Sequence, residues 1–167
     1  MRVLRSFPVL LFALLTAAPA VGDSMWTFDF GVNFFTYNTS YITTGAMYQH
    51  SIREEMDLVY GAEFGITTEE DENGDIKPSF LVPVNIGFYF PFGDEEFSYG
   101  IGTGLSPSFS AGESGDPWIL VGPYLNASVR VKVHPVMKLF VRAQQDLLFG
   151  PPKWIYTGTR LQVGISF

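Results

Sequence analysis

Hydrophobic and polar residues alternate along most of this chain with a period of two, most clearly in its last nine residues. One face of an extended strand over residues 159–167 would carry Thr159, Leu161, Val163, Ile165 and Phe167. Polar or small residues fall on the other face. Successive side chains of a β-strand point to opposite faces, so this pattern predicts a strand with one apolar face. Because a terminal strand is held only by its sheet neighbours, the pattern also predicts sheet pairing.

Seven further segments alternate in the same way, so the sequence predicts eight strands. They cover about residues 25–36, 41–51, 56–67, 78–90, 97–106, 118–134, 137–148 and 154–167. Segments of this length match a membrane-spanning β-strand, which needs about 9–11 residues tilted near 45°. No segment after the N-terminal region has the 18 or more consecutive apolar residues of a transmembrane helix. The sequence therefore favours an all-β protein.

The connections between the predicted strands alternate in character. Those after the second, fourth and sixth strands are short, whereas the others tend to be longer or richer in polar residues, Gly and Pro. Short turns at one end and longer loops at the other are typical of an up-and-down barrel in an outer membrane. Pro83 and Pro123 lie inside predicted strands and each removes a hydrogen-bond donor, so we expect a bulge or a strand boundary at both.

Alternation alone does not say whether the apolar face points into the barrel or away from it. In a soluble barrel the apolar face points inward and the outside is charged. Here the polar face is made mostly of small residues, which suits the narrow lumen of an eight-stranded barrel. Aromatic residues near the strand ends on the apolar face would form the girdles of a membrane barrel: Trp26, Phe80, Phe90, Phe97, Trp118, Trp154 and Phe167. We therefore predict that the apolar face contacts lipid.

The N-terminal segment has the features of a secretory signal peptide. Arg2 and Arg5 precede an apolar stretch over residues 9–18, and small residues follow it. We expect cleavage after Ala20 or Gly22, which removes residues 1–22 and leaves residues 23–167 as the barrel. An uncleaved membrane anchor is the alternative.

Composition and charge narrow the class of protein further. Only 16% of residues are charged, below the roughly 25% of an ordinary soluble domain, and 16% are aromatic. The net charge of −7 falls to −9 without the signal peptide, because two arginines and no acidic residue are lost. A nucleic-acid partner is therefore not expected. The chain has no cysteine, so neither a disulfide frame nor a cysteine-linked lipid is available.

Five charged side chains are expected to point into the lumen: Asp29, Glu63, Arg130, Arg142 and Arg160. Pairing of the eighth strand with the first brings the early acidic residues close to the late arginines. An unpaired charge in a narrow lumen is costly, so we predict a hydrogen-bonded ion network. The network is either a structural plug or the gate of a polar conduit. Tyr124 and Tyr156 are expected to point into the same lumen.

The sequence gives little support to an enzyme or a metal site. Hydrolytic barrels need a Ser–His pair, but His50 and Ser51 are adjacent and so point to opposite faces, and His134 precedes a turn. No P-loop, dinucleotide fingerprint or zinc spacing is present. The acidic loop at residues 69–75 lacks the ligand spacing of a calcium loop, so we expect it to be solvated. We predict no enzymatic activity, no cofactor and no metal.

The mature chain resembles the small eight-stranded outer-membrane β-barrels of bacteria, which include the outer membrane protein W, protein X and protein A transmembrane-domain types. The resemblance rests on the signal peptide, the strand number, the aromatic girdles and Phe167 at the C-terminus. It implies a single antiparallel up-and-down transmembrane barrel, monomeric and surrounded by outer-membrane lipid. In that family the assembly machinery reads the terminal aromatic strand, so Phe167 is the expected assembly signal.

Two functions remain open at this point. The first is a narrow conduit for small or hydrophobic molecules. The second is a non-transporting structural barrel, or one that mediates adhesion or host interaction through its extracellular loops. The resemblance does not choose between them, because one fold serves many functions. The loops at residues 69–75 and 107–117 are the candidate sites for surface ligands.

Overall fold

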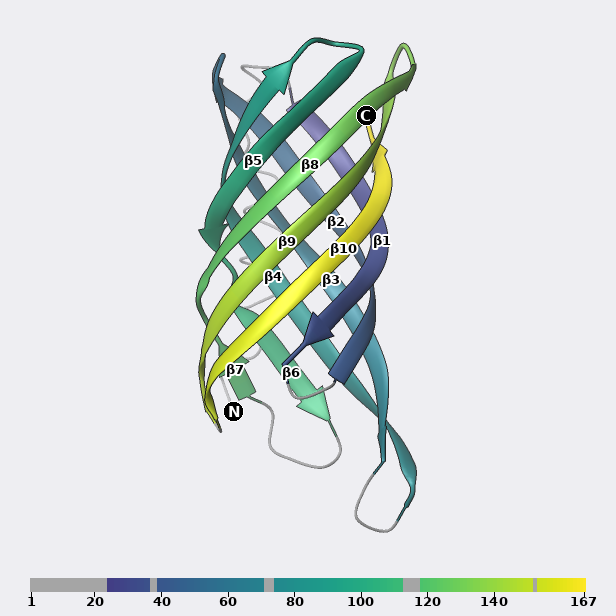
Figure 1. The fold of residues 1–167 in the computed structure, drawn as a ribbon, viewed down its shortest axis with the longest axis vertical. Coiled ribbons are helices and arrows are strands. Elements are labelled where there is room, and N and C mark those ends of the chain that lie inside the picture. Colours follow the sequence, from purple (N-terminus) through teal and green to yellow (C-terminus); the bar gives the residue numbers. More distant parts are fainter. Residues whose placement is uncertain (1–23, 37–38, 71–73, 113–117, 152) are drawn as a thin grey trace, which may run out of the picture.

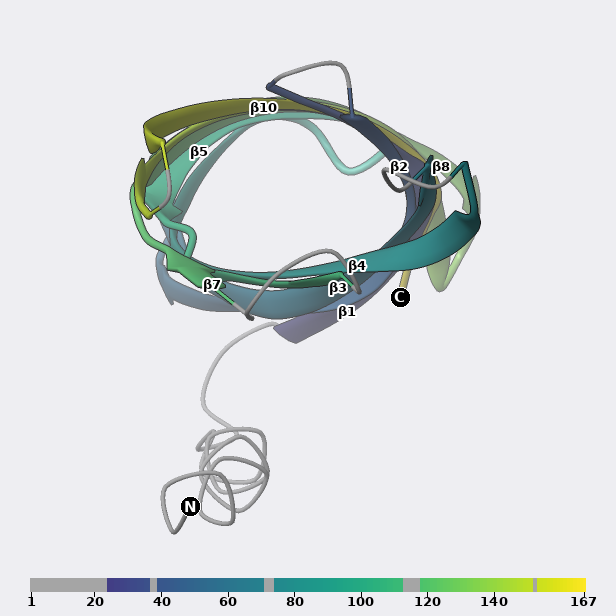
Figure 2. The same ribbon diagram turned by 90° about the horizontal axis from the view of Figure 1, so that it is seen from below.

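The computed structural model describes residues 24–36, 39–70, 74–112, 118–151 and 153–167, and all ten of its regular elements are β-strands. The strands are β1 (Ser24–Phe35), β2 (Thr39–Arg53), β3 (Met56–Glu70), β4 (Ile76–Gly93), β5 (Phe97–Leu105), β6 (Ser108–Gly112), β7 (Trp118–Leu120), β8 (Pro123–His134), β9 (Met137–Gly150) and β10 (Trp154–Ser166). All pairings are antiparallel, and β1 pairs with β10 to close the sheet on itself (Figures 1 and 2). The predicted signal peptide lies outside the described residues.

The ten elements form eight wall strands, as the sequence predicts. β5 and β6 make one wall strand that is interrupted at Ser106 and Pro107, and β7 and β8 make the next. The register is the same on both sides of the interruption, since Pro83 pairs with Ser108 and Ile86 pairs with Leu105.

The two prolines inside the predicted strands differ in outcome. Pro83 lies within β4 without a register shift, so the expected bulge is absent there. The neighbouring amide of Val84 still donates to the carbonyl of Pro107 at 2.7 Å, which keeps the wall strands paired. At Pro123 the expected strand boundary is confirmed, because β8 begins at this residue. The loop predicted at residues 107–117 is shorter than expected, because β6 occupies part of it.

The distribution of side chains is the reverse of that in a soluble barrel. Large hydrophobic residues cover the outside, with Phe30, Leu125 and Val141 all close to 60% exposed (58%, 58% and 59%). Polar residues fill the inside, where Asn85, Arg160 and Gln162 are at most 1% exposed. Water would not tolerate so large an apolar surface, whereas lipid requires it. No helix in the described part of the chain is long and apolar enough to cross a membrane.

The two ends of the barrel differ. The short turns at residues 54–55, 94–96 and 135–136 lie at the end where β1 starts and β10 stops, which is the upper end in Figure 1. We call this the turn end. The connections that follow β1, β3, β6 and β9 lie at the opposite end, which we call the loop end. In an outer-membrane barrel the short turns face the periplasm.

Candidate functional site in the barrel lumen

A compact ion network occupies the middle of the lumen. Arg142 of β9 contacts Asp29 of β1 at 2.5 Å between Nη2 and Oδ2. Arg160 of β10 contacts Glu63 of β3 at 2.8 Å and Asp146 of β9 at 2.5 Å. All five side chains are at most 5% exposed. The closure of β10 onto β1 therefore brings late arginines to early carboxylates.

Glycine at position 45 makes room for this network. Gly45 of β2 lies opposite Asp29 on one neighbouring strand and Glu63 on the other. A Cβ atom at this position would lie 2.6 Å from Cγ of Glu63 and 3.1 Å from Oδ1 of Asp29. The missing side chain gives the two carboxylates the space to reach inward.

Neutral polar groups connect the ion pairs into one network. Arg142 Nε donates to Gln162 Oε1 at 2.8 Å, and Gln162 Nε2 donates to Asp29 at 3.2 Å. Asn85 accepts from Arg160 and donates to Glu63, at 3.1 Å in both cases. Such bonds offset the cost of burying the charges of the network.

Asp146 and the amides were absent from the network that the sequence predicts. Asp146 lies four residues after Arg142, so the alternation that predicts Arg142 on the inward face predicts Asp146 there as well. Its partner could not be found in this way, because the pairing of Asp146 with Arg160 depends on side-chain conformation.

An apolar cluster occupies the lumen between the ion network and the loop end. Its buried members are Phe35, Tyr41, Leu81, Leu120, Leu148 and Tyr156. Trp118 packs on the cluster, stacking with Tyr156 at 5.3 Å and with Phe35 at 6.4 Å between ring centroids. The prediction of Trp118 as a girdle residue is therefore wrong. It occupies the same strand face as Leu120 and Tyr124, which points inward.

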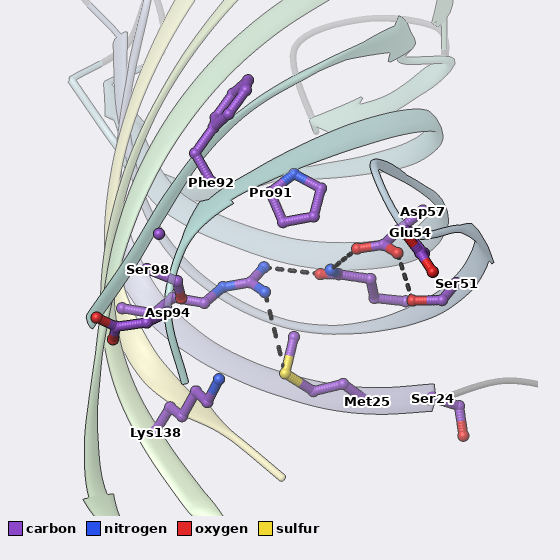
Figure 3. Close-up of a pocket in the computed structure, with 13 residues that line it drawn as sticks. Ser24, Met25, Ser51, Glu54, Asp57, Pro91, Phe92, Asp94, Ser98 and Lys138 are labelled. Carbon is purple, nitrogen blue, oxygen red and sulfur yellow. Dashed lines mark hydrogen bonds between the residues drawn. The ribbon is translucent and has the colours of Figure 1, made fainter. Parts of the chain in front are cut away.

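The turn end is open and contains a cavity of about 310 Å³, which we call the vestibule (Figure 3). Its lining includes Met25, Gln49, Asp57, Arg130 and Lys138. Towards the centre of the barrel a second cavity of only about 10 Å³ follows, lined in part by Arg130 and Arg142. That volume holds about one water molecule.

The structure does not bring Arg130 into the central network. Its Nη2 donates to Gln49 Oε1 at 2.7 Å, and Gln49 Nε2 donates to Asp57 Oδ2 at 2.5 Å (Figure 3). The guanidinium also lies over the ring of Tyr89, 4.6 Å from its centroid. The reason is the position of Arg130 along the barrel axis. Arg130 is two residues closer to the turn end than Ser128, the residue that pairs with Arg142.

Within the described residues, the remaining candidates form no catalytic or metal site. His50 stacks on Tyr48, while Ser51 Oγ donates to Asp57 at 2.6 Å inside the barrel. Among the described residues, no three or more His, Asp or Glu side chains are grouped to hold a metal ion. Residues 71–73 of the acidic loop lie outside the described part. The prediction that the protein is not an enzyme stays a prediction.

Phe167 lies at the seam where the barrel closes. Its backbone N–H donates to Trp26 O at 2.9 Å, and the N–H of Trp26 donates to Phe167 O at 2.8 Å. Its ring stacks on Phe28, with 5.7 Å between the centroids, and is 55% exposed on the outer face. Its role as an assembly signal stays a prediction.

Comparison with known proteins identifies the fold. No family model and no curated protein sequence match the chain. Among solved structures, neisserial surface protein A is similar over 86% of this chain and 94% of its own, with 9% identity and a TM-score of 0.67. The N-terminal β-barrel domain of Pseudomonas aeruginosa OprF covers 87% and 98%, with 13% identity and a TM-score of 0.56. Ail, the attachment invasion locus protein of Yersinia pestis, covers 87% and 99%, with 11% identity and a TM-score of 0.54.

These likenesses confirm the predicted resemblance, and at such low identity they concern the fold alone. The chain therefore has the fold of the small outer-membrane β-barrels.

Proposed function

We propose that this protein is an integral barrel of the bacterial outer membrane that is closed along its axis. It acts as a structural or surface-interaction protein through its loop end. The observation that carries this proposal is the double closure of the lumen. The apolar outer surface supports a location in the outer membrane, where lipid would surround the barrel.

The two closures lie in series along the axis. From the turn end towards the loop end, the small cavity of about 10 Å³ comes first, the ion network second and the apolar cluster third. A solute that enters from the vestibule would first have to break buried ion pairs. It would then have to displace closely packed apolar side chains such as Leu81 and Leu120, which are at most 1% exposed. Removal of either layer alone leaves the other in place.

The loop end offers a surface suited to interaction. β3 and β4 pair as far as Glu70 and Ile76, whereas the pairing of β3 with β2 stops at Ile66. The hairpin therefore extends beyond its neighbours and forms the lowest part of the barrel in Figure 1. Ile76 near its tip is 75% exposed, and the sequence over residues 69–75, which covers the end of β3 and the connection to β4, is rich in Asp and Glu. A cationic surface is the partner that this hairpin would attract.

The conduit for small or hydrophobic molecules is the alternative function, and conductance separates the two. We expect refolded protein in planar bilayers to show no steady current under an applied voltage. A large open-channel current from the unmodified protein would refute the closed-lumen proposal and favour the conduit.

A second experiment tests the interaction surface. Protein in lipid nanodiscs is offered to immobilised polylysine, and the variant replaces Glu69, Glu70 and Asp75 with their amides. We expect the variant to bind more weakly. The control replaces Glu54 and Glu55 at the turn end and should bind like the unmodified protein. Equal loss in both variants would show that binding follows net charge and not the hairpin.

A further inference from the structure

The vestibule at the turn end has no role in the function proposed above. We propose that it binds a small carboxylate-bearing solute from the periplasm, held by Arg130 and Lys138. These side chains come from the neighbouring strands β8 and β9 and line the same cavity of about 310 Å³.

Arg130 has unused hydrogen-bonding capacity. A guanidinium carries five N–H donors, but only one hydrogen bond from Arg130 reaches an oxygen atom of the described residues, that of Gln49. Nη1 faces the sulfur of Met25 at 4.0 Å, which is a weak contact. Nε is buried and has no partner within the described residues. Arg142 and Arg160, in contrast, each contact a carboxylate.

Two of the three carboxylates around the vestibule already accept hydrogen bonds from the protein. Both carboxylate oxygens of Asp57 accept hydrogen bonds, one from Gln49 and one from Ser51. Oδ1 of Asp94 accepts from the backbone N–H groups of Glu96 and Phe97 at 2.9 and 2.8 Å, so it stabilises the turn. Gln49 thus stands between Arg130 and Asp57, and the arginine is not neutralised directly. Glu54 on the rim, together with Asp57 and Asp94, whose hydrogen-bond donors are neutral, opposes an incoming anion, so the ligand has to contact Arg130 and Lys138 directly.

Lys138 adds a second positive charge without an ion pair in the described structure. It lies opposite Lys132 in the β8–β9 ladder, and two like charges at such positions repel each other. Lys132 is paired with Glu95, whose pKa is lowered mainly by this contact and further by the charge of Lys138, but Lys138 itself forms no ion pair with Glu95. The vestibule therefore holds two cations from adjacent strands, with the hydroxyl groups of Ser24 and Ser98 on its lining.

The chemistry of the two cations points to a carboxylate. The planar fork of a guanidinium matches the two oxygens of a carboxylate, and an ammonium nearby adds a point charge. Two kinds of molecule could supply this carboxylate: a small organic acid, and a short peptide through its free C-terminus. The vestibule opens at the turn end, so the solute would arrive from the periplasmic side.

Calorimetric titration of the refolded protein in detergent tests the proposal with three probes: succinate, trialanine, and trialanine amide. We expect saturable binding of succinate or trialanine and none of the amide. Succinate alone would identify an organic acid site, and trialanine alone a peptide terminus. We expect Arg130→Gln to raise the Kd at least ten-fold and Lys138→Gln several-fold. Arg53→Gln removes the same charge from the same end without lining the vestibule, so its Kd should be unchanged.

The proposal is overturned if none of the probes binds saturably, if the amide binds as well as the free peptide, or if Arg53→Gln weakens binding as much as Arg130→Gln. Heat-modifiability on a gel checks that each variant is folded. If Arg130→Gln fails to fold, Lys138→Gln and the amide comparison decide, because neither depends on that variant. Binding of the free acid that Lys138→Gln leaves unchanged would then refute the site.

Discussion

Arg160→Met is the substitution that probes the lumen most directly. Arg160 has a side-chain exposure of 1% and contacts two carboxylates, those of Glu63 and Asp146. It also donates to Asn85 and to Ser106 Oγ at 3.1 and 3.2 Å. Methionine has a similar unbranched shape and fills the space without a charge. The change therefore strands two buried carboxylates.

The expected loss follows from that burial. Removing one partner of a buried ion pair costs about 3–5 kcal/mol, because the remaining charge stays desolvated. At about 1.4 kcal/mol for each factor of ten, that loss lowers the folding equilibrium constant by roughly two to three and a half orders of magnitude. The exposed pair of Lys132 and Glu95 provides the control, since Lys132→Met should cost only about 0–1 kcal/mol.

Urea unfolding in lipid vesicles, followed by tryptophan fluorescence, measures both losses. Combining Arg160→Met with Glu63→Gln and Asp146→Asn should recover much of the stability, because amides leave no stranded charge. If Arg160→Met loses no more free energy of unfolding than Lys132→Met, the central ion pairs do not stabilise the barrel and the reasoning fails.

Two further predictions follow from the closures at the loop end and the seam. Leu120→Ala, in the apolar cluster, should lower the free energy of unfolding by about 2–5 kcal/mol and leave the bilayer current at zero. The lipid-facing Leu125→Ala is the control and should lower the free energy of unfolding by less. A steady current from Leu120→Ala would show that the ion network does not block the lumen. Deletion of Phe167 should lower the membrane-inserted fraction in cells more than Phe28→Ala does, although both changes remove the same ring stacking. The inserted fraction is measured on a heat-modifiability gel. Equal fractions for the two variants would show that Phe167 contributes packing and not an assembly signal.

The strand pattern was predictable because the barrel wall follows a local rule. Alternation places Phe30 and Asp29 on opposite faces, since neighbours along a strand face opposite sides. The small residues of the polar face and the aromatic residues of the apolar face then indicate that Phe30 points outward and Asp29 inward. The closure of β10 onto β1 follows from the strand number, and it brings Asp29 near Arg142. The position of Arg130 could not be obtained in this way, because it depends on the stagger between neighbouring strands.

The apolar cluster was missed for a different reason. Leu81, Leu120 and Leu148 stand at inward positions, but alternation along one strand does not show that they meet in a separate layer. Their grouping needs the register of strands far apart in sequence, which the alternation does not contain. Pro83 likewise predicts a disturbance in the wall, but the bond from Val84 to Pro107 preserves the register.

The seam between β1 and β10 has a consequence for how the barrel forms. It pairs Thr27 with Ser166, so the contact that closes the wall joins residues 139 positions apart (166 minus 27). The entropy of closing so long a loop opposes this step by on the order of 4 kcal/mol, and contacts of this span make folding slow. Arg142 and Arg160 meet Asp29 and Glu63 only when the late strands reach the early ones. Neutralisation of the interior and closure of the wall are thus one cooperative event, and a half-built barrel would present both open edges and unpaired charge to the bilayer.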